Sequence, residues 1–352
     1  MVSGYRHLVF EDLETDILVG LGLDKFIDPS SIVDEAIDER ANPKKGIASP
    51  WSKLSEFELP QQGITLFGGY SGHSKSTIIS QWALHACASG HKVALASLEL
   101  TNTHLYEMLA SQAACVAKPP DSYLEEFAAW ADGKLHIVDS HDVMKPDEVI
   151  ELVKDSKRLL GCSLFVLDCL FQVDLGGELE DEKQFFQRLA AVARDYELAI
   201  VVVHHAKKPS GPEGEAKPPA KESFIGSSHL VNAAAAVVVC HEDVKKSMAR
   251  NAGEEVDDTY GDFSISVLKS RFSPWIGQVG LYKHKTARLL CNSRARQYNP
   301  IDVREVTRCK NLQSEKSGAY SQEADPNGLL ESLAREITPT IDTTQKSTEY
   351  PF

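Results

Sequence analysis

The stretch Gly68-Gly69-Tyr70-Ser71-Gly72-His73-Ser74-Lys75-Ser76-Thr77 decides the fold of this chain. A largely apolar run at residues 64–67 precedes it, and a helical pattern begins near Ile78. A strand, a glycine-rich turn and a helix that opens with Lys-Ser-Thr form the usual context of a phosphate-binding loop. Glycines let successive backbone N–H groups face an anion, and the N-terminus of the helix adds partial positive charge. The stretch therefore predicts a nucleotide site.

The side chains of this loop have separate expected roles. Lys75 would reach the β- and γ-phosphates of the nucleotide, and Ser76 would bind Mg²⁺. The loop departs from the pattern G-x-x-x-x-G-K-[ST] because Ser74 stands where the second glycine belongs, and a side chain there could crowd the phosphates or strain the loop. The alternative is a chance glycine- and serine-rich loop before a helix. The residues expected to bind nucleotide are Gly69, Gly72, His73, Ser74, Lys75, Ser76, Thr77 and, further along the chain, Asp168.

The composition is ordinary for a soluble globular protein, with 42% apolar and 25% charged residues among 352. No apolar run approaches the length of a membrane span, and the N-terminus lacks the regions of a secretory signal. We therefore expect no membrane partner and a cytoplasmic location. The net charge of −14 disfavours nonspecific coating of DNA, although basic residues confined to one channel or loop would still allow a nucleic acid partner.

Cysteine and histidine give no metal signal in the sequence. The seven cysteines are scattered, and their odd number without C-x-x-C pairs favours neither a disulfide framework nor a zinc site. The pair His204-His205 has no cysteine or carboxylate at ligand spacing. A reducing, cytosolic setting fits these counts best.

From Trp51 onward, strand and helix patterns alternate. Apolar runs predict strands at 64–67, 93–97, 135–138, 164–167, 200–203, 235–239, 263–268 and 279–282, and helical patterns lie at 78–89, 103–116, 147–158 and 182–196. Repeated βα units with near-continuous apolar strands indicate an α/β fold whose parallel sheet is covered on both faces. Ligands bind beyond the carboxyl ends of such strands, so the residues directly after each strand are the functional candidates.

Three predicted strands are followed by residues with suitable chemistry. Glu99 could polarise a water for attack on the γ-phosphate, or it could cap the following helix. Asp168 ends an apolar strand, as the acid on the Mg²⁺ side does in P-loop ATPases. His205 could sense the γ-phosphate and relay its loss to the next loop, or belong to an ordinary pair of loop histidines.

Two further segments carry positive charge. Residues 206–224 contain prolines, glycines and lysines without periodicity, which predicts a long flexible loop, and Lys207, Lys208, Lys217 and Lys221 could neutralise the phosphates of a single DNA strand. A solvated surface loop is the alternative. Lys269 and Arg271 share one face of a strand and could reach the nucleotide of a neighbouring subunit, unless they belong to an exposed basic edge strand.

Taken together, these motifs resemble those of the RecA-fold ring helicases: the helicase half of the bacteriophage helicase–primase, mitochondrial Twinkle and DnaB-type replicative helicases. The resemblance covers roughly residues 46–290 and includes features of plasmid RepA-type hexameric helicases. Its pieces are Ser71–Thr77, Ala96–Glu99, Leu167–Asp168, Val203–Lys207, Ile225–Ser228 and Leu268–Phe272, in matching order and spacing. The N-terminal arm is short and lacks zinc-ligand cysteines, so no primase module is expected.

The resemblance implies a RecA-like P-loop NTPase core with a mostly parallel sheet flanked by helices, using ATP or another NTP with Mg²⁺. It implies that Glu99 activates water, that His205 senses the γ-phosphate, and that Arg271 with Lys269 acts on the adjacent subunit of a ring, which is a hexamer in such helicases. It also implies that the loop carrying Lys207, Lys208, Lys217 and Lys221 grips single-stranded DNA, and that a second channel loop lies near Gly176-Gly177.

The expected organisation has three parts. Residues 1–48 form a short helical arm or linker that could dock on another subunit, 49–300 form the ATPase and helicase domain, and 301–352 form a flexible acidic tail that could dock a replication protein. The expected function is an ATP-dependent DNA helicase acting in replication, with a phage-infected host cytoplasm as one setting. The alternatives are a DNA-dependent ATPase that does not unwind DNA, such as a recombinase or loader, and a non-catalytic interaction protein with a decayed P-loop.

Overall fold

A computed structural model describes residues 27, 29–43, 45–139, 143–207, 217–224, 228–284, 286–294 and 301–303. They belong to the first of two compact units, Met1–Val303. The second unit, Arg304–Phe352, and with it most of the predicted tail, lies outside the described residues. Residues 1–26 of the predicted N-terminal arm also lie outside them, as does the middle of the lysine-bearing loop, 208–216, which includes Lys208.

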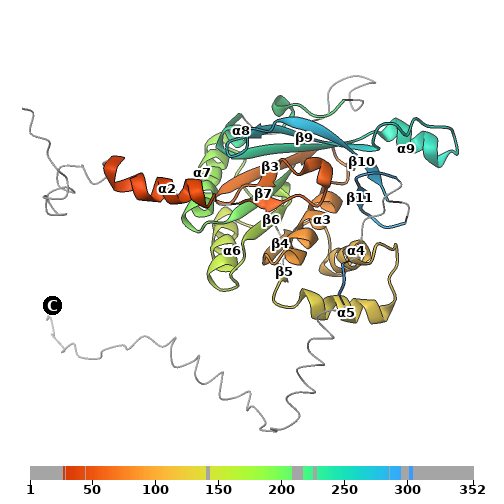
Figure 1. Cartoon of the computed structure of the whole chain (residues 1–352), viewed down its shortest axis with the longest axis horizontal. Coiled ribbons are helices and arrows are strands. Elements are labelled where there is room, and N and C mark those ends of the chain that lie inside the picture. The colour runs from red at the N-terminus through yellow and green to blue at the C-terminus, as the bar shows by residue number, and fades with distance from the viewer. Residues whose placement is uncertain are drawn as a thin grey trace, which may run out of the picture. The chain divides into compact units, whose positions relative to one another are not determined.

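Nine strands of the described chain form one mixed sheet (Figure 1). Their order across the sheet is β11-β10-β9-β8-β3-β7-β6-β4-β5. The six strands from β8 to β5 are parallel, and β9, β10 and β11 extend the β8 edge by antiparallel pairing. Their bounds are β3 (Gly63–Gly69), β4 (Val93–Ser97), β5 (Leu135–Ile137), β6 (Leu164–Asp168), β7 (Ala199–His205), β8 (Ala236–Glu242), β9 (Phe263–Ser270), β10 (Gly277–Lys283) and β11 (Leu290–Cys291).

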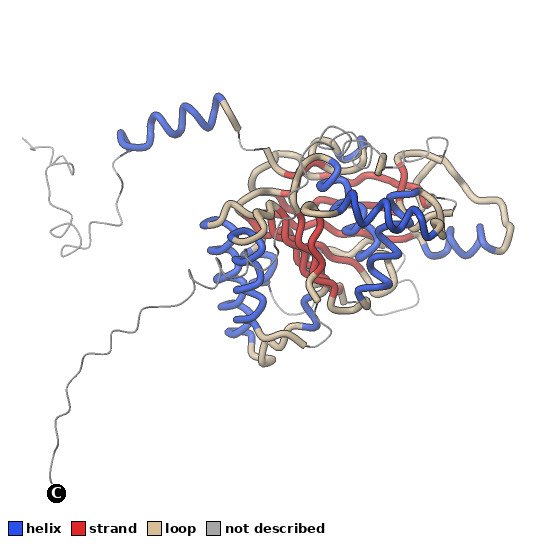
Figure 2. The backbone as a smooth tube through the Cα atoms, turned by 90° about the horizontal axis from the view of Figure 1, so that it is seen from below, coloured by secondary structure: helices blue, strands red, loops and turns tan. Residues whose placement is uncertain are grey.

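Helices cover both faces of this sheet, with α6 and α7 on one side of the strands and α3 and α4 on the other (Figures 1 and 2). The described helices are α2 (Val33–Ala41), α3 (Lys75–Ala88), α4 (Asn102–Ala114), α5 (Asp121–Ala131), α6 (Pro146–Arg158), α7 (Leu179–Asp195), α8 (Ser228–Ala233) and α9 (Val244–Asn251). This arrangement is the predicted α/β architecture. Among the described residues, no helix is both long and apolar enough to cross a membrane.

The core follows from the alternation of side chains along each strand. Every second residue of β3, Ile64 and Leu66, packs into one apolar cluster with Phe185, Phe186 and Leu189 of α7. The neighbouring strands add their own alternate residues to the same cluster, including Phe165, Leu167, Ile200, Val202, Val237 and Val239. All seven residues of β3 are buried, as expected for a central parallel strand that helices cover on both faces.

The segment before β3 packs on the sheet as part of the same unit. Trp51 and Phe57 make edge-to-face contacts with Trp82 of α3, at ring-centroid distances of 5.7 and 6.1 Å. The indole nitrogen of Trp51 also donates a hydrogen bond to the Leu290 carbonyl, 3.0 Å away. The same segment contains a short two-stranded sheet, in which β1 (Ile47–Ala48) pairs antiparallel with β2 (Glu58–Leu59).

The eight predicted strands are all present, and the four predicted helices correspond to α3, α4, α6 and α7. Some elements were not located from the sequence. Within residues 1–48, predicted as a helical arm or linker, the charged stretch from Asp34 belongs to helix α2, which ends at Ala41. Helix α3 begins at Lys75 and not at Ile78, and the sequence patterns did not identify α5 or α9.

Candidate active site

The loop that leads into α3 is held in a tight turn. Gly72 has φ +82, and Ser74 has φ 58 and ψ 29, the left-handed conformation that L side chains rarely adopt. The predicted strain at Ser74 is therefore present in the backbone. The buried His73 braces the turn, because its Nδ1 accepts a hydrogen bond from the Glu242 N–H, 3.0 Å away at the end of β8.

Close packing explains the two glycines at the end of β3. A Cβ at Gly68 would lie 2.1 Å from the ring of Phe224, and one at Gly69 would lie 2.9 Å from the Cys240 carbonyl. The Phe224 ring also stacks on His204, with an interplanar angle of 9°. Both positions therefore require glycine, because a Cβ atom would overlap these neighbours. The turn also contacts the segment that begins at residue 217.

Four of the predicted functional side chains meet at the carboxyl edge of the sheet. They are Lys75 at the start of α3, Glu99 after β4, Asp168 at the end of β6 and His205 at the end of β7. The Lys75 nitrogen donates to the Tyr70 carbonyl at 3.0 Å and lies 3.1 Å from His205 Nδ1. His205 Nε2 lies 3.3 Å from a Glu99 carboxylate oxygen. The structure thus links Lys75, His205 and Glu99 in a continuous polar network, and their charges act on the nearby Asp168 carboxylate.

Glu99 does not cap the following helix. The hydroxyl of Thr101 fills that position and accepts a hydrogen bond from the His104 N–H. The Glu99 carboxylate instead accepts a hydrogen bond from the Cys169 thiol, 2.9 Å away. Burial opposes the negative charge, but hydrogen bonds from Cys169 and His205 outweigh it and keep the pKa of Glu99 below its usual value. Glu99 is therefore ionised at neutral pH.

Asp168 and Lys75 are both buried charged groups. Burial raises the pKa of Asp168 to about 6, although Ser76 donates a hydrogen bond to its carboxylate. Burial lowers the pKa of Lys75, whose side chain lies among the thiol of Cys240 and the carboxylates of Asp168 and Glu99. Ser76 and Asp168 offer two hard oxygen donors at one point, the donor type that Mg²⁺ prefers. The residues present therefore fit a magnesium ion.

The loop after β7 is hydrogen-bonded to the turn before α3. Ala206 pairs with Phe224 as an isolated antiparallel bridge, and the Lys207 N–H donates to the Ser223 carbonyl at 2.6 Å. The Tyr70 hydroxyl donates to the Lys217 carbonyl, 3.3 Å away. Of the four predicted lysines, Lys207, Lys217 and Lys221 are described, and all three flank the base of the loop.

Lys269 and Arg271 lie at the opposite edge of the sheet. The antiparallel β9 brings its end beside the start of β8, and the Arg271 N–H donates to the Ala235 carbonyl. The seven residues of β3, at about 3.3 Å each, separate this edge from Lys75 by about 20 Å. Arg271 is exposed. The Lys269 nitrogen instead donates to the carbonyls of Val231, Asn232 and Ala234 at the end of α8, at 2.6, 3.1 and 2.7 Å.

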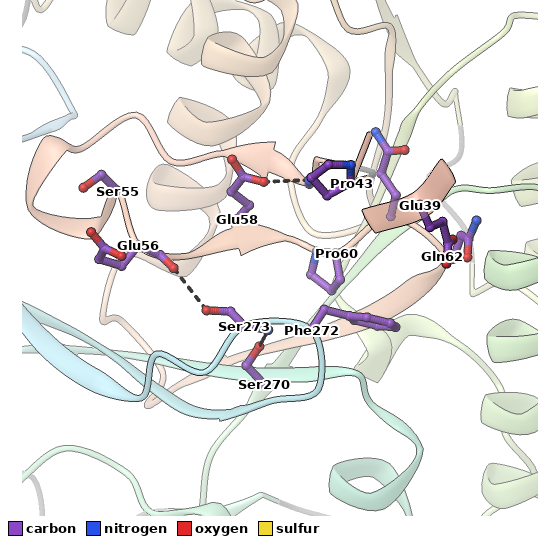
Figure 3. A pocket seen from close by; sticks show the side chains of 12 residues that line it. Glu39, Pro43, Ser55, Glu56, Glu58, Pro60, Gln62, Ser270, Phe272 and Ser273 are labelled. Atoms are coloured by element: carbon purple, nitrogen blue, oxygen red, sulfur yellow. Dashed lines mark hydrogen bonds between the residues drawn. The ribbon is translucent and has the colours of Figure 1, made fainter. Parts of the chain in front are cut away.

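A pocket of about 490 Å³ lies at this second edge, where Phe272 and Pro60 lie side by side (Figure 3). Its lining includes three glutamates and, among the described residues, no lysine or arginine, so these side chains do not favour phosphate. A smaller pocket of about 370 Å³ adjoins Ser74 and Thr77 of the phosphate-binding turn. Its lining also includes two cations and apolar groups: Phe263, Lys283, His284, Ala287, Arg288, Leu289 and Leu290.

Several residues of this site do not stand out in the sequence. Cys169 directly follows Asp168 at the carboxyl edge, so the same position rule that selected Asp168 could have found it. Tyr70 supplies a carbonyl to Lys75 and a hydroxyl to the loop after β7. The Glu242 backbone anchors His73, a contact between distant segments that no local pattern reveals.

The parallel sheet, the turn before α3 and the acid at the end of β6 define a RecA-like P-loop NTPase fold. Residues 45–211 match the sequence family described as AAA domain. The structure is similar to a solved structure described as an ATPase domain, with a TM-score of 0.62 and 14% identity over 75% of this chain and 98% of that one. It is also similar to a DnaB-like replicative helicase whose structure was described with its interactions with primase. There the TM-score is 0.61 and the identity 13%, over 79% of this chain and 71% of that chain.

Proposed function

We propose that this protein is an ATP-dependent DNA helicase that moves along single-stranded DNA and separates duplex strands during replication. The observation that carries the proposal is the clustering of Lys75, Glu99, Asp168 and His205 at the carboxyl edge of a RecA-like sheet. A decayed nucleotide site has no physical need for an ionised base, a buried acid and a buried lysine at one point. The cytoplasm of a cell, or of a host infected by a phage, is where such a protein would act.

In this proposal, each side chain of the cluster has its own role. Lys75 leaves His205 to meet the β- and γ-phosphates of ATP, and the backbone N–H groups of the loop contact the same phosphates. Glu99 accepts the proton of the attacking water at its carboxylate. Ser76 and Asp168 would hold Mg²⁺, which when bound neutralises phosphate charge. His205, which contacts both Lys75 and Glu99, links the presence of the γ-phosphate to the position of the base.

The nucleoside would lie in the pocket beside Ser74 and Thr77. Its volume of about 370 Å³ is within the range of small-molecule sites, and Phe263 and Leu289 give it apolar surface for a base. Lys283 and Arg288 supply positive charge at the same place. The pocket continues directly from the turn that would bind the phosphates, which supports one nucleotide spanning both.

Arg271 would complete the site of a second copy of the chain. It cannot reach Lys75 of its own chain, because about 20 Å of β3 separates the two edges of the sheet. An exposed arginine at the far edge suits a ring in which each subunit presents Arg271 to its neighbour's nucleotide. We propose a homo-oligomeric ring, with six subunits by resemblance, and residues 1–48 as an arm that docks on an adjacent subunit.

Single-stranded DNA would contact the loop after β7. Lys207, Lys217 and Lys221 flank its base, and the Tyr70 hydroxyl joins Lys217 to the phosphate-binding turn. This hydrogen bond would couple the nucleotide site to the loop that contacts DNA. Lys208 belongs to the same proposal, as does docking of a replication protein on residues 301–352.

The test is to measure ATP hydrolysis with and without single-stranded DNA, beside unwinding of a forked duplex. We expect DNA-stimulated hydrolysis with unwinding in the wild type. We expect Lys75→Ala to lose both activities by at least about a hundredfold, because the phosphates lose their positioned cation. Stimulated hydrolysis without unwinding would favour a recombinase or loader. Normal hydrolysis in Lys75→Ala would overturn the assignment of the phosphate-binding loop.

A further inference from the structure

A cysteine, a histidine and a glutamate meet at the centre of the proposed ATPase site. They come from three separate strand ends: Glu99 after β4, Cys169 after β6 and His205 at the end of β7. Their donor atoms all lie within 4.8 Å of one another. The Cys169 Sγ to Glu99 Oε1 distance is 2.9 Å, His205 Nε2 to Glu99 Oε1 is 3.3 Å, and Cys169 Sγ to His205 Nε2 is 3.8 Å.

These distances are close to those of a tetrahedral zinc site. With metal–ligand bonds of about 2.0–2.3 Å, tetrahedral angles place neighbouring donor atoms about 3.4–3.6 Å apart. Each observed distance lies within about 0.7 Å of this range, and the Glu99 side chain, which is 37% exposed, has room to adjust. Three protein ligands would leave the fourth position open toward the space in front of the site.

The chemistry of the donors separates this cluster from the magnesium pair. Thiolate and imidazole are soft and borderline ligands that select Zn²⁺, whereas Mg²⁺ prefers oxygen. The oxygen donors belong to Ser76 and Asp168, and Cys169 directly follows Asp168 in the chain. Asp168 and Cys169, which are adjacent at the end of β6, therefore favour different metal ions, Mg²⁺ and Zn²⁺ respectively.

We propose that Glu99, Cys169 and His205 form an inhibitory binding site for a thiophilic divalent cation such as Zn²⁺. The site itself stands on the geometry of the three side chains. Its inhibitory effect rests on the proposed function, because it requires that Glu99 act as the base for hydrolysis.

Metal binding would rearrange the polar network in a defined way. The Cys169 thiol releases its proton to solvent and forms the metal–sulfur bond as a thiolate. His205 binds through the Nε2 lone pair, so its proton sits on Nδ1, which can then no longer accept a hydrogen bond from the Lys75 ammonium group. Lys75 is thereby released toward the phosphates while Glu99 is held by the metal. Zinc should therefore lower the rate of hydrolysis and leave nucleotide binding intact.

The direct test uses Co²⁺ as a spectroscopic substitute for Zn²⁺ in the full-length, reduced protein. We expect a thiolate-to-cobalt charge-transfer band that Zn²⁺ displaces, and isothermal titration of Zn²⁺ should give one site per chain. Cys169→Ser should abolish the band and weaken Zn²⁺ binding at least about tenfold. Cys169→Ala provides a second variant, and circular dichroism checks that both variants fold.

Cys115→Ser is the matched control, because Cys115 lies at the end of α4, outside the cluster. It should keep both the band and the affinity. A band that persists in Cys169→Ser, or one that disappears in Cys115→Ser, would overturn the assignment. If Zn²⁺ displaces the Cys169-dependent cobalt band but saturating Zn²⁺ leaves hydrolysis unaffected, the inhibitory role would be overturned. A protein that hydrolyses no ATP under any condition would contradict the proposed function, and the cobalt spectrum would still decide the site.

Discussion

Lys75 shows how one side chain connects the parts of the site. Its ammonium group contacts the Tyr70 carbonyl in the phosphate-binding turn and His205 at the end of β7. Burial lowers its pKa, so a nucleotide phosphate that replaces these contacts meets a lysine already stripped of water. In the proposed function, Lys75 would exchange these partners for the phosphates of the nucleotide.

Replacing Ser74 by glycine tests whether this unusual loop residue contributes to nucleotide binding. It holds φ 58, where glycine is unstrained, so we expect Ser74→Gly to raise the free energy of unfolding by up to about 1 kcal/mol. Nucleotide binding should stay unchanged or tighten. Urea denaturation and titration with a fluorescent ATP analogue measure both quantities. A tenfold loss of nucleotide affinity would show that the Ser74 hydroxyl contributes to binding.

Asp168 gives a pH dependence with a defined sign. Burial raises its pKa to about 6, so the carboxylate that would hold Mg²⁺ is protonated below that pH and ionised above it. Affinity for Mg²⁺–nucleotide should therefore fall about tenfold between pH 7 and pH 5. Asp168→Asn, whose side chain does not titrate, should show only the pH dependence of the nucleotide itself. An equal slope in both proteins would contradict this role for Asp168.

At the scale of elements, the end of β9 carries two cations with different surroundings. Lys269 donates to three carbonyls at the end of α8, whereas the guanidinium of the exposed Arg271 donates to the Asn232 carbonyl. Burial lowers the pKa of Lys269 to about 8, with a smaller effect from Arg271. The sequence placed both on one strand face, but only the packing of α8 shows that Lys269 makes three hydrogen bonds to this region and that the exposed Arg271 makes one.

This difference predicts opposite phenotypes for the two cations. Lys269→Met should lower the free energy of unfolding by about 1–3 kcal/mol, because it removes the hydrogen bonds that anchor α8. Arg271→Met should change stability by less than about 0.5 kcal/mol and should abolish hydrolysis. Thermal unfolding and ATPase assays on both variants provide the comparison. A large stability loss in Arg271→Met would indicate a structural role instead.

The elements that the sequence predicted are those with strong apolar periodicity. The parallel strands have near-continuous apolar runs, and the residues after them could be selected by position alone. Helix α5 was missed because prolines and acidic residues at 119–126 obscure its apolar positions. Helix α9 was missed because its eight residues are mostly polar, with only Lys246 buried. The contacts among Glu99, Cys169 and His205 join residues up to 106 positions apart, and no local pattern encodes them.

For the whole molecule, the separation of Lys75 and Arg271 is the central feature. The two ends of one sheet hold the two halves of the proposed catalytic apparatus. One chain cannot close this gap, so activity should depend on assembly. The net charge of −14 is compatible with a DNA partner if contact is limited to the lysines around the loop after β7.

The measurement that tests this account most directly mixes two inactive variants. The Arg271→Ala subunit still has Glu99, and the Glu99→Gln subunit still has Arg271. An interface is therefore complete where the nucleotide site of an Arg271→Ala subunit receives Arg271 from a Glu99→Gln subunit. Random assembly of equal amounts makes about a quarter of the interfaces complete. We predict that each variant alone binds nucleotide without hydrolysing it and that the mixture regains hydrolysis. No recovery at any ratio, with both variants folded and co-assembled, would contradict a site shared between two subunits.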